Sequence, residues 1–257
     1  MKGLDGKVAL VTGGGKGIGR SIALALAARG VRVVITGRDE RALGETVGEM
    51  AYGGGKARHV AGDVANPSHV AAAVNRAIEV FGGLDIVIAN AGQSGRVELG
   101  SDLARAQAIL STNLMGAYYT FNAAAAQMKG PGRLIATSSA LGHVGAAGHA
   151  AYCASKAGIV GLVRATAHEL APRKITCNAL LPDWVDSDAT ARRLAELAAA
   201  EGKAKEAVTA ATLGTLPLGR LLQPEEVAEL VLFLCSTSGD AITGQAISIG
   251  PGTSRFG

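Results

Sequence analysis

Three side chains, those of Ser139, Tyr152 and Lys156, have types and spacing that suit acid–base chemistry on an oxygen atom. Tyr152 and Lys156 stand four positions apart, and Ser139 precedes the tyrosine by thirteen positions. Residues i and i+4 of a helix share one face, so the ammonium can lie beside the phenol. A nearby cation favours the phenolate and brings a group with a reference pKa of about 10 toward a useful range. A serine hydroxyl at the same point could hold a carbonyl oxygen.

A glycine-rich turn near the amino terminus strengthens this signal, because a tyrosine–lysine pair alone is often only helix surface. The apolar run Val8–Val11 is typical of a buried parallel strand, and the helical spacing of apolar residues begins at Ile18. The turn that joins them contains Thr12, Gly13, Gly15, Lys16 and Gly17, and Gly19 follows Ile18. The backbone N–H groups of such a strand–turn–helix unit bind phosphate. A turn without chemistry is the alternative, but the context favours a bound dinucleotide.

From about Gly6 to Gly252 the chain resembles the short-chain dehydrogenase/reductase family. The family's Thr-Gly-x-x-x-Gly-x-Gly turn is matched by Thr12, Gly13, Gly17 and Gly19. Its Asn-Asn-Ala-Gly element appears as Ala89-Asn90-Ala91-Gly92, with the first Asn replaced. Its four catalytic residues correspond to Asn113, Ser139, Tyr152 and Lys156. Each motif is weak alone, but together they are specific.

The resemblance implies a reaction that moves a hydride between C4 of a nicotinamide and a carbonyl or carbinol carbon. We expect Tyr152 to donate the proton and Ser139 to orient the oxygen. Lys156 would lower the phenol pKa and hold the nicotinamide ribose. Asn113 would position a water that links Lys156 to solvent; alternatively, it satisfies backbone groups within its own helix. Ser138 competes for the serine role, and only the thirteen-residue spacing favours Ser139.

The end of the second predicted strand favours NADP over NAD. An NAD site generally ends this strand with a carboxylate on the ribose 2′-OH, but here Gly37 leaves space and Arg38 offers a cation. Lys16 could reach the same point, and two cations suit a 2′-phosphate. Basic residues at these positions mark the NADP-dependent members of the family. Asp39 keeps NAD as the less favoured cofactor, and two solvated loop charges are the alternative without function.

The remaining cofactor contacts are implied by the resemblance. Asp63 and Val64 resemble the adenine-contacting pair of the family, although Asp63 could equally cap a turn. Pro182, Val185 and Ser187 resemble the segment that clamps the nicotinamide carboxamide. The full set of predicted contacts is Thr12, Gly13, Gly15, Lys16, Gly17, Ile18, Gly19, Arg38, Asp63, Val64, Asn90, Ala91, Gly92, Tyr152, Lys156, Pro182, Val185 and Ser187.

Two segments depart from the family pattern. Asp183 stands where the family has a glycine after the proline. A carboxylate near the nicotinamide would favour the cationic, oxidised ring and therefore NADP⁺; the alternative is a carboxylate that points to solvent. Near the carboxyl end, Ile249-Gly250-Pro251-Gly252 replaces the family's Asp-Gly-Gly, a change that bears on local packing more than on chemistry.

The substrate side is the least specific part of the sequence. Residues from about 189 to 217 have few large apolar anchors and resemble the family's substrate lid, and few apolar contacts imply mobility. The predicted substrate residues are Gln93, Ser94, Leu141, His143, His149 and Trp184. The two histidines could be second acids, but loop histidines are usually bystanders. Family members that act on 3-oxoacyl thioesters, sugars, steroids and small alcohols share this framework.

Apolar runs alternate with helical patterns, which predicts an α/β, doubly wound, Rossmann-type parallel sheet with helices on both faces. The strand-like runs are Val8–Val11, Val31–Ile35, Lys56–Val60, Ile86–Ala89, Leu134–Thr137, Ile175–Leu180 and Ala246–Ile249. The helical patterns are Ile18–Arg29, Arg41–Met50, Ser68–Phe81, Leu103–Met128, Tyr152–Leu170 and Pro224–Cys235. Because no segment reads as a linker, we expect one dinucleotide-binding domain, 1–257, that includes the lid.

Composition narrows the range of partners. The net charge is only +4, with Lys and Arg scattered among acids, which disfavours nucleic-acid binding. The amino terminus lacks an apolar signal segment, and the uncharged stretch Ala106–Met128 holds polar residues, so we expect no membrane partner. Three widely spaced cysteines without metal-ligand spacing predict no metal and small buried residues in a reducing cytoplasm. The helices that contain Ala106–Met128 and Tyr152–Leu170 suit burial between subunits, and the resemblance implies a homotetramer.

Two rival functions stay open at this point. Extended relatives that epimerise or dehydrate nucleotide-linked substrates also use Tyr-x-x-x-Lys, but they need a larger substrate domain than 257 residues allow. The second rival is a non-catalytic dinucleotide-binding sensor or scaffold. The intact set of Asn113, Ser139, Tyr152 and Lys156 argues against it.

Overall fold

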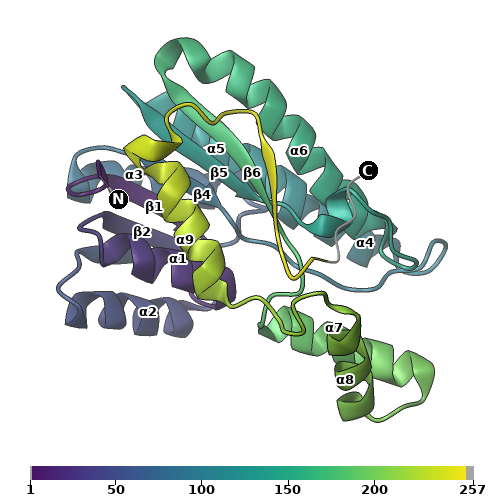
Figure 1. The fold of residues 1–257 in the computed structure, drawn as a ribbon. Helices are drawn as coiled ribbons and strands as arrows, with labels where there is room; N and C mark the ends of the chain where they lie inside the picture. The colour runs from purple at the N-terminus through teal and green to yellow at the C-terminus, as the bar shows by residue number, and fades with distance from the viewer. Residues whose placement is uncertain (1, 253–257) are drawn as a thin grey trace.

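The computed structural model describes residues 2–252, and it confirms the predicted seven-stranded parallel sheet (Figure 1). The strands pair in the order β3-β2-β1-β4-β5-β6-β7. They span β1 Val8–Thr12, β2 Arg32–Gly37, β3 Ala57–Ala61, β4 Ile86–Ala89, β5 Gly132–Thr137, β6 Ile175–Pro182 and β7 Ala246–Ile249. Each predicted strand-like run is a strand, although several ends differ by one or two residues.

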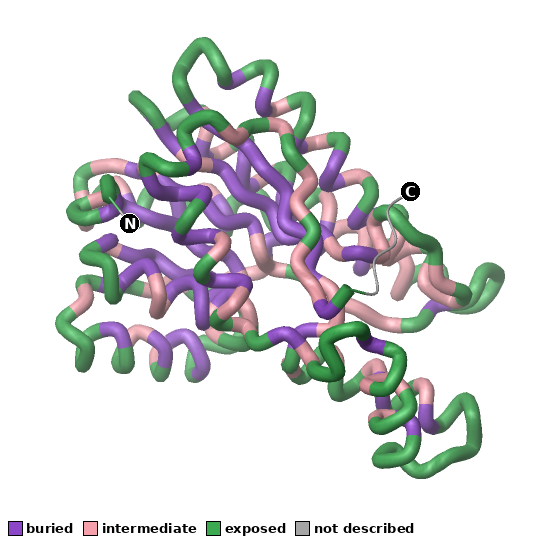
Figure 2. The backbone as a smooth tube through the Cα atoms, in the orientation of Figure 1, coloured by how far each residue is buried: buried purple, intermediate pink, exposed green. Residues whose placement is uncertain are grey.

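Helices cover both faces of the sheet, as the alternating pattern predicts. One face carries α1 Gly17–Ala27, α2 Glu40–Tyr52 and α9 Pro224–Cys235. The other carries α3 Pro67–Phe81, α5 Gly116–Gln127 and α6 Ala150–Leu170. Successive strand residues point to opposite faces, so Ile86 and Ile88 enter the first core while Val87 and Ala89 enter the second. Every residue of β1, β4 and β6 is buried, and these strands lie in the purple centre of Figure 2.

The winding direction of the chain reverses at β1, which pairs with β2 on one side and with β4 on the other. The loops that leave the carboxyl ends of β1 and β4 therefore turn toward opposite faces of the sheet. In doubly wound folds this divergence opens a crevice in which ligands bind. The glycine-rich turn after β1 and the segment Asn90–Gly92 after β4 both lie at this crevice.

The helix predicted over Leu103–Met128 is interrupted, and this is a correction to the sequence-based expectation. The chain forms α4 Leu103–Leu110, a π-helical turn over Ser111–Met115, and then α5, which ends at Gln127. A π-helical turn marks a place where a residue leaves the regular helical bonding pattern, often at a functional position. The residue concerned is Asn113, whose side chain is bonded outside its own helix.

Two helices project from the body of the molecule at the position expected for the lid. They are α7 Asp188–Glu201 and α8 Lys205–Thr215, seen at the lower right of Figure 1. Within them only Leu194, Ala198 and Val208 are buried, and both helices are largely exposed in Figure 2. Low apolar burial of this kind gives a segment low local stability.

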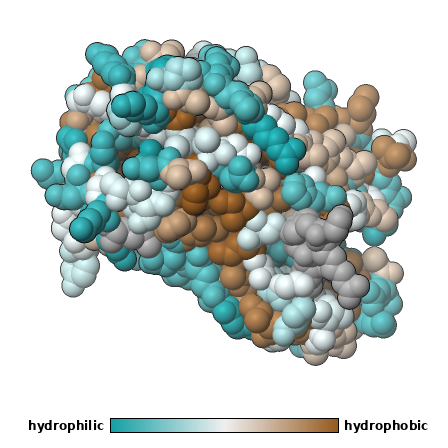
Figure 3. Space-filling model, turned by 45° about the horizontal axis from the view of Figure 1, so that its top comes forward, coloured by the Kyte–Doolittle hydropathy of each residue, from teal (hydrophilic) through white to brown (hydrophobic). Residues whose placement is uncertain are grey.

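The surface of the described chain is largely polar, with apolar side chains gathered near the centre of the face in Figure 3. Among the large apolar side chains, Leu103 is 82% exposed and Tyr118 is 48% exposed. No helix within residues 2–252 combines the length and apolar character needed to cross a membrane. Of the three cysteines, Cys177 and Cys235 are buried as predicted, whereas Cys153 is only half-buried.

The central position of β5 gives a test of the fold. Leu134 is fully buried in β5, so Leu134→Ala should lower the free energy of unfolding by about 2–5 kcal/mol, because it removes apolar contacts and leaves a cavity. Leu218→Ala is the matched control, since Leu218 is 59% exposed, and it should change stability by less than about 0.5 kcal/mol. Urea unfolding followed by circular dichroism measures both. Equal losses in the two variants would contradict the assigned core.

Candidate active site

Two adjoining cavities lie at the carboxyl ends of the strands. The larger cavity, of about 460 Å³, extends from the glycine turn past Ser139 and Tyr152 to α7. The smaller cavity, of about 360 Å³, extends from the same turn toward the ends of β2 and β3. Gly13, Lys16, Ala91 and Gly92 line both. A single elongated ligand could therefore occupy the two cavities together.

The glycine turn between β1 and α1 has a backbone that other residues would not tolerate. Gly17 has φ +52 and faces the larger cavity, where an added Cβ would lie 4.0 Å from the Ser187 Cβ. A Cβ at Gly19 would lie 2.2 Å from the carbonyl oxygen of Gly13, a distance that no real structure accepts. The turn is therefore tightly packed against its own backbone at Gly19, and it borders the cavity at Gly17. The first N–H groups of α1 are presented to the opening.

Thr12 and Asn90 fix the walls of this opening. The Thr12 hydroxyl oxygen accepts hydrogen bonds from the backbone N–H groups of Asn90 and Ala91, both at 3.0 Å. The Asn90 amide donates to the Thr12 carbonyl at 3.1 Å, and its oxygen accepts from the Thr137 hydroxyl at 3.1 Å. The ends of β1, β4 and β5 are therefore bound together by side chains. Thr12 and Gly19, predicted as cofactor contacts, line neither cavity and support the turn from behind.

Ser139, Tyr152 and Lys156 meet in the larger cavity, as the spacing predicts. The ammonium of Lys156 lies 5.7 Å from the centre of the Tyr152 ring. It donates to the Thr137 carbonyl at 2.7 Å and is only 4% exposed. Burial in a poorly solvated setting lowers the pKa of this ammonium to about 8. The group therefore exchanges its proton much closer to neutral pH than an exposed lysine does.

The competition between the two serines is settled by their partners. The Ser138 hydroxyl donates to the backbone carbonyl of Lys156 at 2.7 Å and is buried. The Ser139 side chain lowers the pKa of Tyr152 and accepts a hydrogen bond from the Leu141 N–H at 3.2 Å. Ser138 is thus committed to holding α6 against β5, and Ser139 is the serine that reaches the phenol.

The pKa of Tyr152 differs from the expectation that Lys156 would lower it. Burial raises the pKa of this phenol above its ordinary value, and the hydrogen bond from Ser139 and the charge of Arg193 oppose that rise. The carboxylate of Asp183 raises it further. Lys156 contributes little here because its ammonium is turned toward the Thr137 carbonyl. The charge of Arg193 on α7, which lowers the pKa of the phenol, has no marked pattern in the sequence.

Asn113 binds residues outside its own helix, which excludes the alternative of purely local bonding. Its oxygen accepts from the Gln93 N–H at 2.8 Å, and its amide donates to the Gln93 carbonyl at 3.0 Å and to the Ser155 hydroxyl at 3.0 Å. The side chain is buried and lines neither cavity. A Cβ added to Gly92 would lie 3.3 Å from Asn113 Oδ1 and 3.5 Å from Lys156 Nζ. The two predicted relay residues therefore approach the same point.

The predicted substrate residues differ in whether they line the larger cavity and in whether their side chains are already bonded to the protein. Ser94, Leu141, His149 and Trp184 line the larger cavity, whereas His143 lies outside its lining. Gln93 lines the cavity too, but its side chain is held elsewhere. It donates to the Ala108 carbonyl at 2.7 Å and to the Thr112 hydroxyl at 2.8 Å, and it accepts from Arg105 at 2.8 Å. The amide of the Gln93 side chain is thus bonded to α4 and to the π-helical turn that follows it.

The smaller cavity contains the predicted cofactor residues Gly15, Arg38, Asp63 and Val64. Asp63 also caps a turn, because its carboxylate accepts from the Ala65 N–H at 3.0 Å. The turn-capping interpretation of Asp63 is therefore confirmed, and its contact with adenine stays a prediction.

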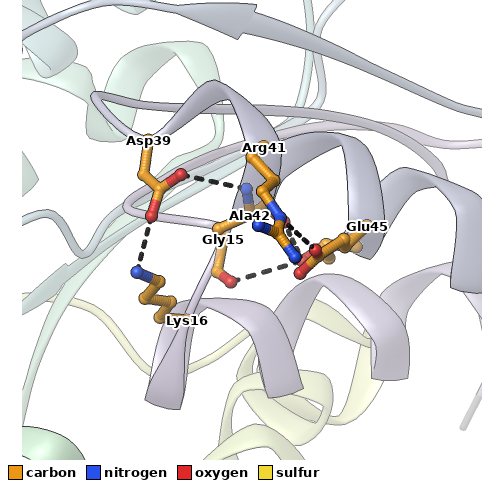
Figure 4. A network of polar contacts seen from close by, with 7 residues as sticks. Gly15, Lys16, Asp39, Arg41, Ala42 and Glu45 are labelled. Carbon is orange, nitrogen blue, oxygen red and sulfur yellow. Dashed lines mark hydrogen bonds and ion pairs between the residues drawn. The ribbon is translucent and has the colours of Figure 1, made fainter.

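The charge of Lys16 is not free at the entrance to the smaller cavity. Its ammonium binds the Asp39 carboxylate at 2.6 Å (Figure 4). Asp39 also accepts from the Ala42 N–H at 3.1 Å and so caps α2. This is a correction to the expectation that Lys16 and Arg38 together present two unpaired cations. Arg38 remains the basic residue of that lining without an ion pair among residues 2–252.

Several cavity residues escaped the sequence analysis. Thr137 offers its backbone carbonyl to Lys156, a role that no side-chain pattern reveals. From α7, Arg192, Arg193 and Glu196 line the larger cavity, and the Arg193 guanidinium lies 4.3 Å from the centre of the Trp184 ring. Their contact depends on how α7 folds back over the end of β6. Within residues 2–252 no group of three or more His, Cys, Asp or Glu side chains is placed to hold a metal ion.

Comparisons with known proteins give one consistent result over nearly the whole chain. A family model described as enoyl-(acyl carrier protein) reductase matches residues 13–254. A 3-oxoacyl-(acyl-carrier-protein) reductase of Aquifex aeolicus is 36% identical over 253 residues, which cover 97% of this chain and 98% of that protein.

Two solved structures are similar in both fold and sequence. A variant of actinorhodin polyketide ketoreductase with NADPH has a TM-score of 0.93 and 32% identity, with 100% of each chain covered. A short-chain dehydrogenase from Burkholderia cenocepacia in complex with NADP has a TM-score of 0.87 and 34% identity, with 97% and 98% covered.

Burial of Lys156 predicts a specific pH dependence of stability. The folded-state pKa of about 8 lies below the ordinary 10.5, so between these values the unfolded chain binds more protons at this position than the folded chain. The wild type should therefore gain stability relative to Lys156→Met as pH rises, by on the order of 2 kcal/mol from pH 7.5 to 10. Urea unfolding at both pH values measures the difference in the free energy of unfolding between the two proteins. The contributions of the other titrating groups largely cancel in this difference. A pH-independent difference would show that the ammonium is not desolvated.

Proposed function

The chain belongs to the short-chain dehydrogenase/reductase family, and on that premise we propose how its site works as an oxidoreductase that uses NADP(H). The reaction is hydride transfer between the cofactor and a ketone or secondary alcohol. One observation carries the proposal. Ser139 and Tyr152 line one cavity together with a nearly fully buried lysine, and the Ser139 hydroxyl lowers the pKa of the phenol. A non-catalytic dinucleotide sensor would need no such pair of convergent hydroxyls.

The residues present fit a nicotinamide dinucleotide. The side-chain-free surface of Gly17 faces the larger cavity, and the first turn of α1 offers unpaired N–H groups for a pyrophosphate. The adenosine half would occupy the smaller cavity beside Arg38, Asp63 and Val64. The nicotinamide half would lie along Pro182, Val185 and Ser187, which line the larger cavity. NADPH, when bound, supplies the hydride.

Tyr152 is the proposed proton donor. During reduction, negative charge develops on the carbonyl oxygen, and a donor within hydrogen-bond reach lowers the barrier. The Ser139 hydroxyl holds the same oxygen and orients it. Because burial keeps the Tyr152 phenol protonated, the side chain is in the form that a reductase needs at the start of its cycle.

Lys156 and Asn113 are proposed to return the proton to the site. The pKa of about 8 lets the ammonium release and recover a proton near neutral pH. Asn113 holds the Gln93 backbone and the Ser155 hydroxyl beside that ammonium. The Ser155 hydroxyl in turn donates to the Tyr152 carbonyl at 2.7 Å. This chain of bonds fixes the distance between the relay and the phenol.

A 3-oxoacyl thioester is the proposed substrate class. The Aquifex aeolicus protein is named as a 3-oxoacyl-(acyl-carrier-protein) reductase, and the actinorhodin protein is named as a polyketide ketoreductase. Helices α7 and α8, within residues 189–217, are the proposed substrate lid, since they contact mainly each other and border the larger cavity. An elongated acyl chain would leave the cavity beneath them.

We also propose a homotetramer in the cytoplasm. The exposed apolar side chains Leu103, Met115 and Tyr118 lie on α4, the π-helical turn and α5, and such clusters mark protein interfaces. Three cysteines without a disulfide suit a reducing compartment. The single domain proposed over 1–257 includes residues 1 and 253–257, which lie outside the described residues.

Replacement of single hydroxyl groups tests the proposed chemistry. Tyr152→Phe should lower kcat for NADPH-dependent reduction of a 3-oxoacyl thioester by about 10²–10⁴-fold, because the proton donor is lost. Binding of NADPH should remain, as measured by fluorescence titration.

Ser139→Ala and Ser138→Ala form a matched pair beside it. Ser139→Ala should lower kcat by roughly 10²-fold with little change in stability. Ser138→Ala should instead lower the free energy of unfolding by about 1 kcal/mol, through loss of the bond to the Lys156 carbonyl, with a smaller effect on kcat. Turnover of 2-enoyl but not 3-oxoacyl thioesters by the wild type would refute the substrate class.

The cofactor preference is tested at Arg38. Arg38→Asp should reverse the ratio of kcat/KM for NADP to that for NAD, with a change of about 10- to 100-fold, because a cation on the 2′-phosphate becomes a carboxylate. Arg41→Asp is the control with the same charge change. Arg41 lies three residues away on α2, binds Glu45 and lines neither cavity (Figure 4). An unchanged ratio in Arg38→Asp would refute the role of Arg38.

A further inference from the structure

Trp184 is held in an unusual backbone conformation at the end of β6. Its φ is +46, a left-handed value rare for a bulky residue. The peptide groups around it are fixed, since the Asp183 N–H donates to the Ile249 carbonyl at 3.0 Å and the Leu222 N–H donates to the Trp184 carbonyl at 2.9 Å. The backbone therefore determines where the indole lies. Such over-determined strain clusters at ligand-binding positions.

Helix α7 folds back so that Arg193 covers this indole. Ser187 caps the helix by accepting from the Thr190 N–H, and the Thr190 hydroxyl donates to the Val185 carbonyl. These bonds fix the first turn of α7 close to the end of β6. The guanidinium of Arg193, one turn further on, lies 4.3 Å from the centre of the Trp184 ring. A cation at this distance from an indole is held by the ring electrons.

The hydrogen-bonding edge of Arg193 is unused by the protein. Within residues 2–252 its guanidinium makes no ion pair and no hydrogen bond to a protein acceptor. Glu196 lines the same cavity but is not paired with it. By contrast, Arg20, Arg41 and Arg220 each bind a carboxylate. The contact with the ring occupies none of the N–H groups of the guanidinium, so they remain available to an acceptor.

Arg193 lies close enough to Tyr152 to change the pKa of its phenol. Arg193, Trp184 and Tyr152 line one cavity, and the charge of Arg193 lowers the pKa of Tyr152. The charged groups that face the phenol are Arg193 from α7, Asp183 from the end of β6, and Lys156 from α6, whose ammonium is bonded to Thr137. Arg193 is the cation among them that has donors to spare.

We propose that Arg193 is a specificity-determining substrate residue, which donates hydrogen bonds to a second oxygen of the substrate beside the carbonyl that is reduced. In a 3-oxoacyl thioester this oxygen is the thioester carbonyl. The inference rests on the proposed function and names what the lid recognises. Trp184 already holds the guanidinium in place, so less conformational entropy is lost when the substrate binds it. A ketone without the second oxygen leaves a partly buried cation unpaired, and this disfavours its binding.

Two methyl ketones of equal chain length test the inference. Ethyl acetoacetate has a second carbonyl beside the ketone, and 2-heptanone replaces it with methylene groups. In Arg193→Met, the ratio of kcat/KM for ethyl acetoacetate to that for 2-heptanone should fall by about 10-fold or more, the loss expected for a hydrogen bond to a charged donor. Because the ratio is compared between proteins, the intrinsic reactivity of each ketone cancels. Arg193→Lys, which keeps the charge but loses the planar donors, should recover only part of the ratio.

Two controls separate substrate contact from a structural effect. Lys203→Met removes another positive charge of the α7–α8 region, one that binds Glu201 and does not line the cavity, and it should leave the ratio unchanged. Trp184 is the only tryptophan in the chain, so its fluorescence reports directly whether the stacking partner has changed in Arg193→Met while the lid stays folded.

The outcomes distinguish the inference from the function on which it rests. An equal fall for both ketones would mean that Arg193 acts only through Tyr152 or the lid, and it would overturn the inference. Unchanged kcat/KM values for both ketones in Arg193→Met would also overturn it, while continued NADPH-dependent reduction of both ketones would leave the proposed function standing. A wild-type protein that reduces neither ketone nor any 3-oxoacyl thioester would overturn both.

Discussion

The attachment of Lys156, a residue of α6, to the end of β5 is the constraint on which the geometry of the site depends. Its ammonium donates to the Thr137 carbonyl, and its own backbone carbonyl accepts from Ser138. Through its side chain and its backbone, this one residue of α6 is therefore bonded to two successive residues at the carboxyl end of β5. Because Tyr152 lies one helical turn before Lys156, fixing the lysine also fixes the phenol beside Ser139. The same burial that fixes the lysine brings its pKa to about 8. Structural support and proton exchange therefore arise from a single desolvated cation.

The parallel sheet supplies the frame for this arrangement. All strands end at one edge, so loops distant in sequence meet there, and buried polar groups must find partners in one another. Thr12, Asn90 and Thr137 form such a set across β1, β4 and β5. Asn113 extends it into the helical layer, because the π-helical turn aims its amide at Gln93 and Ser155. Each bond satisfies a buried group and also positions a cavity wall. This explains why several residues that resemble cofactor contacts have no free polar atom.

Helix α7 contributes to the electrostatics of the phenol as well as to the lining of the cavity. Arg193 lowers the pKa of Tyr152, and Asp183 raises it. The aspartate belongs to the rigid end of β6, where Gly250 makes room for it: a Cβ there would lie 2.9 Å from the Asp183 Cβ. The arginine instead belongs to α7, which has little apolar burial. A movement of α7 would therefore change the balance of charge at the phenol together with access to the substrate. In the proposed function, the position of α7 and the protonation of Tyr152 are therefore coupled through Arg193.

The sequence by itself determined the strands, the order of elements, the glycine turn and the three side chains, Ser139, Tyr152 and Lys156, that meet in the larger cavity. These follow from local patterns, since buried parallel strands, i,i+4 spacing and a strand–glycine–helix unit leave direct marks in the chain. Only the tertiary structure decided how the charges are paired. Lys16 binds Asp39, Lys156 turns to a backbone carbonyl, Ser138 holds α6, and the cation near Tyr152 comes from Arg193. Such pairings join residues that are far apart in sequence or use backbone groups common to every residue. The sequence does not encode them as a pattern, because burial and distance, which set their energies, exist only after the chain has folded.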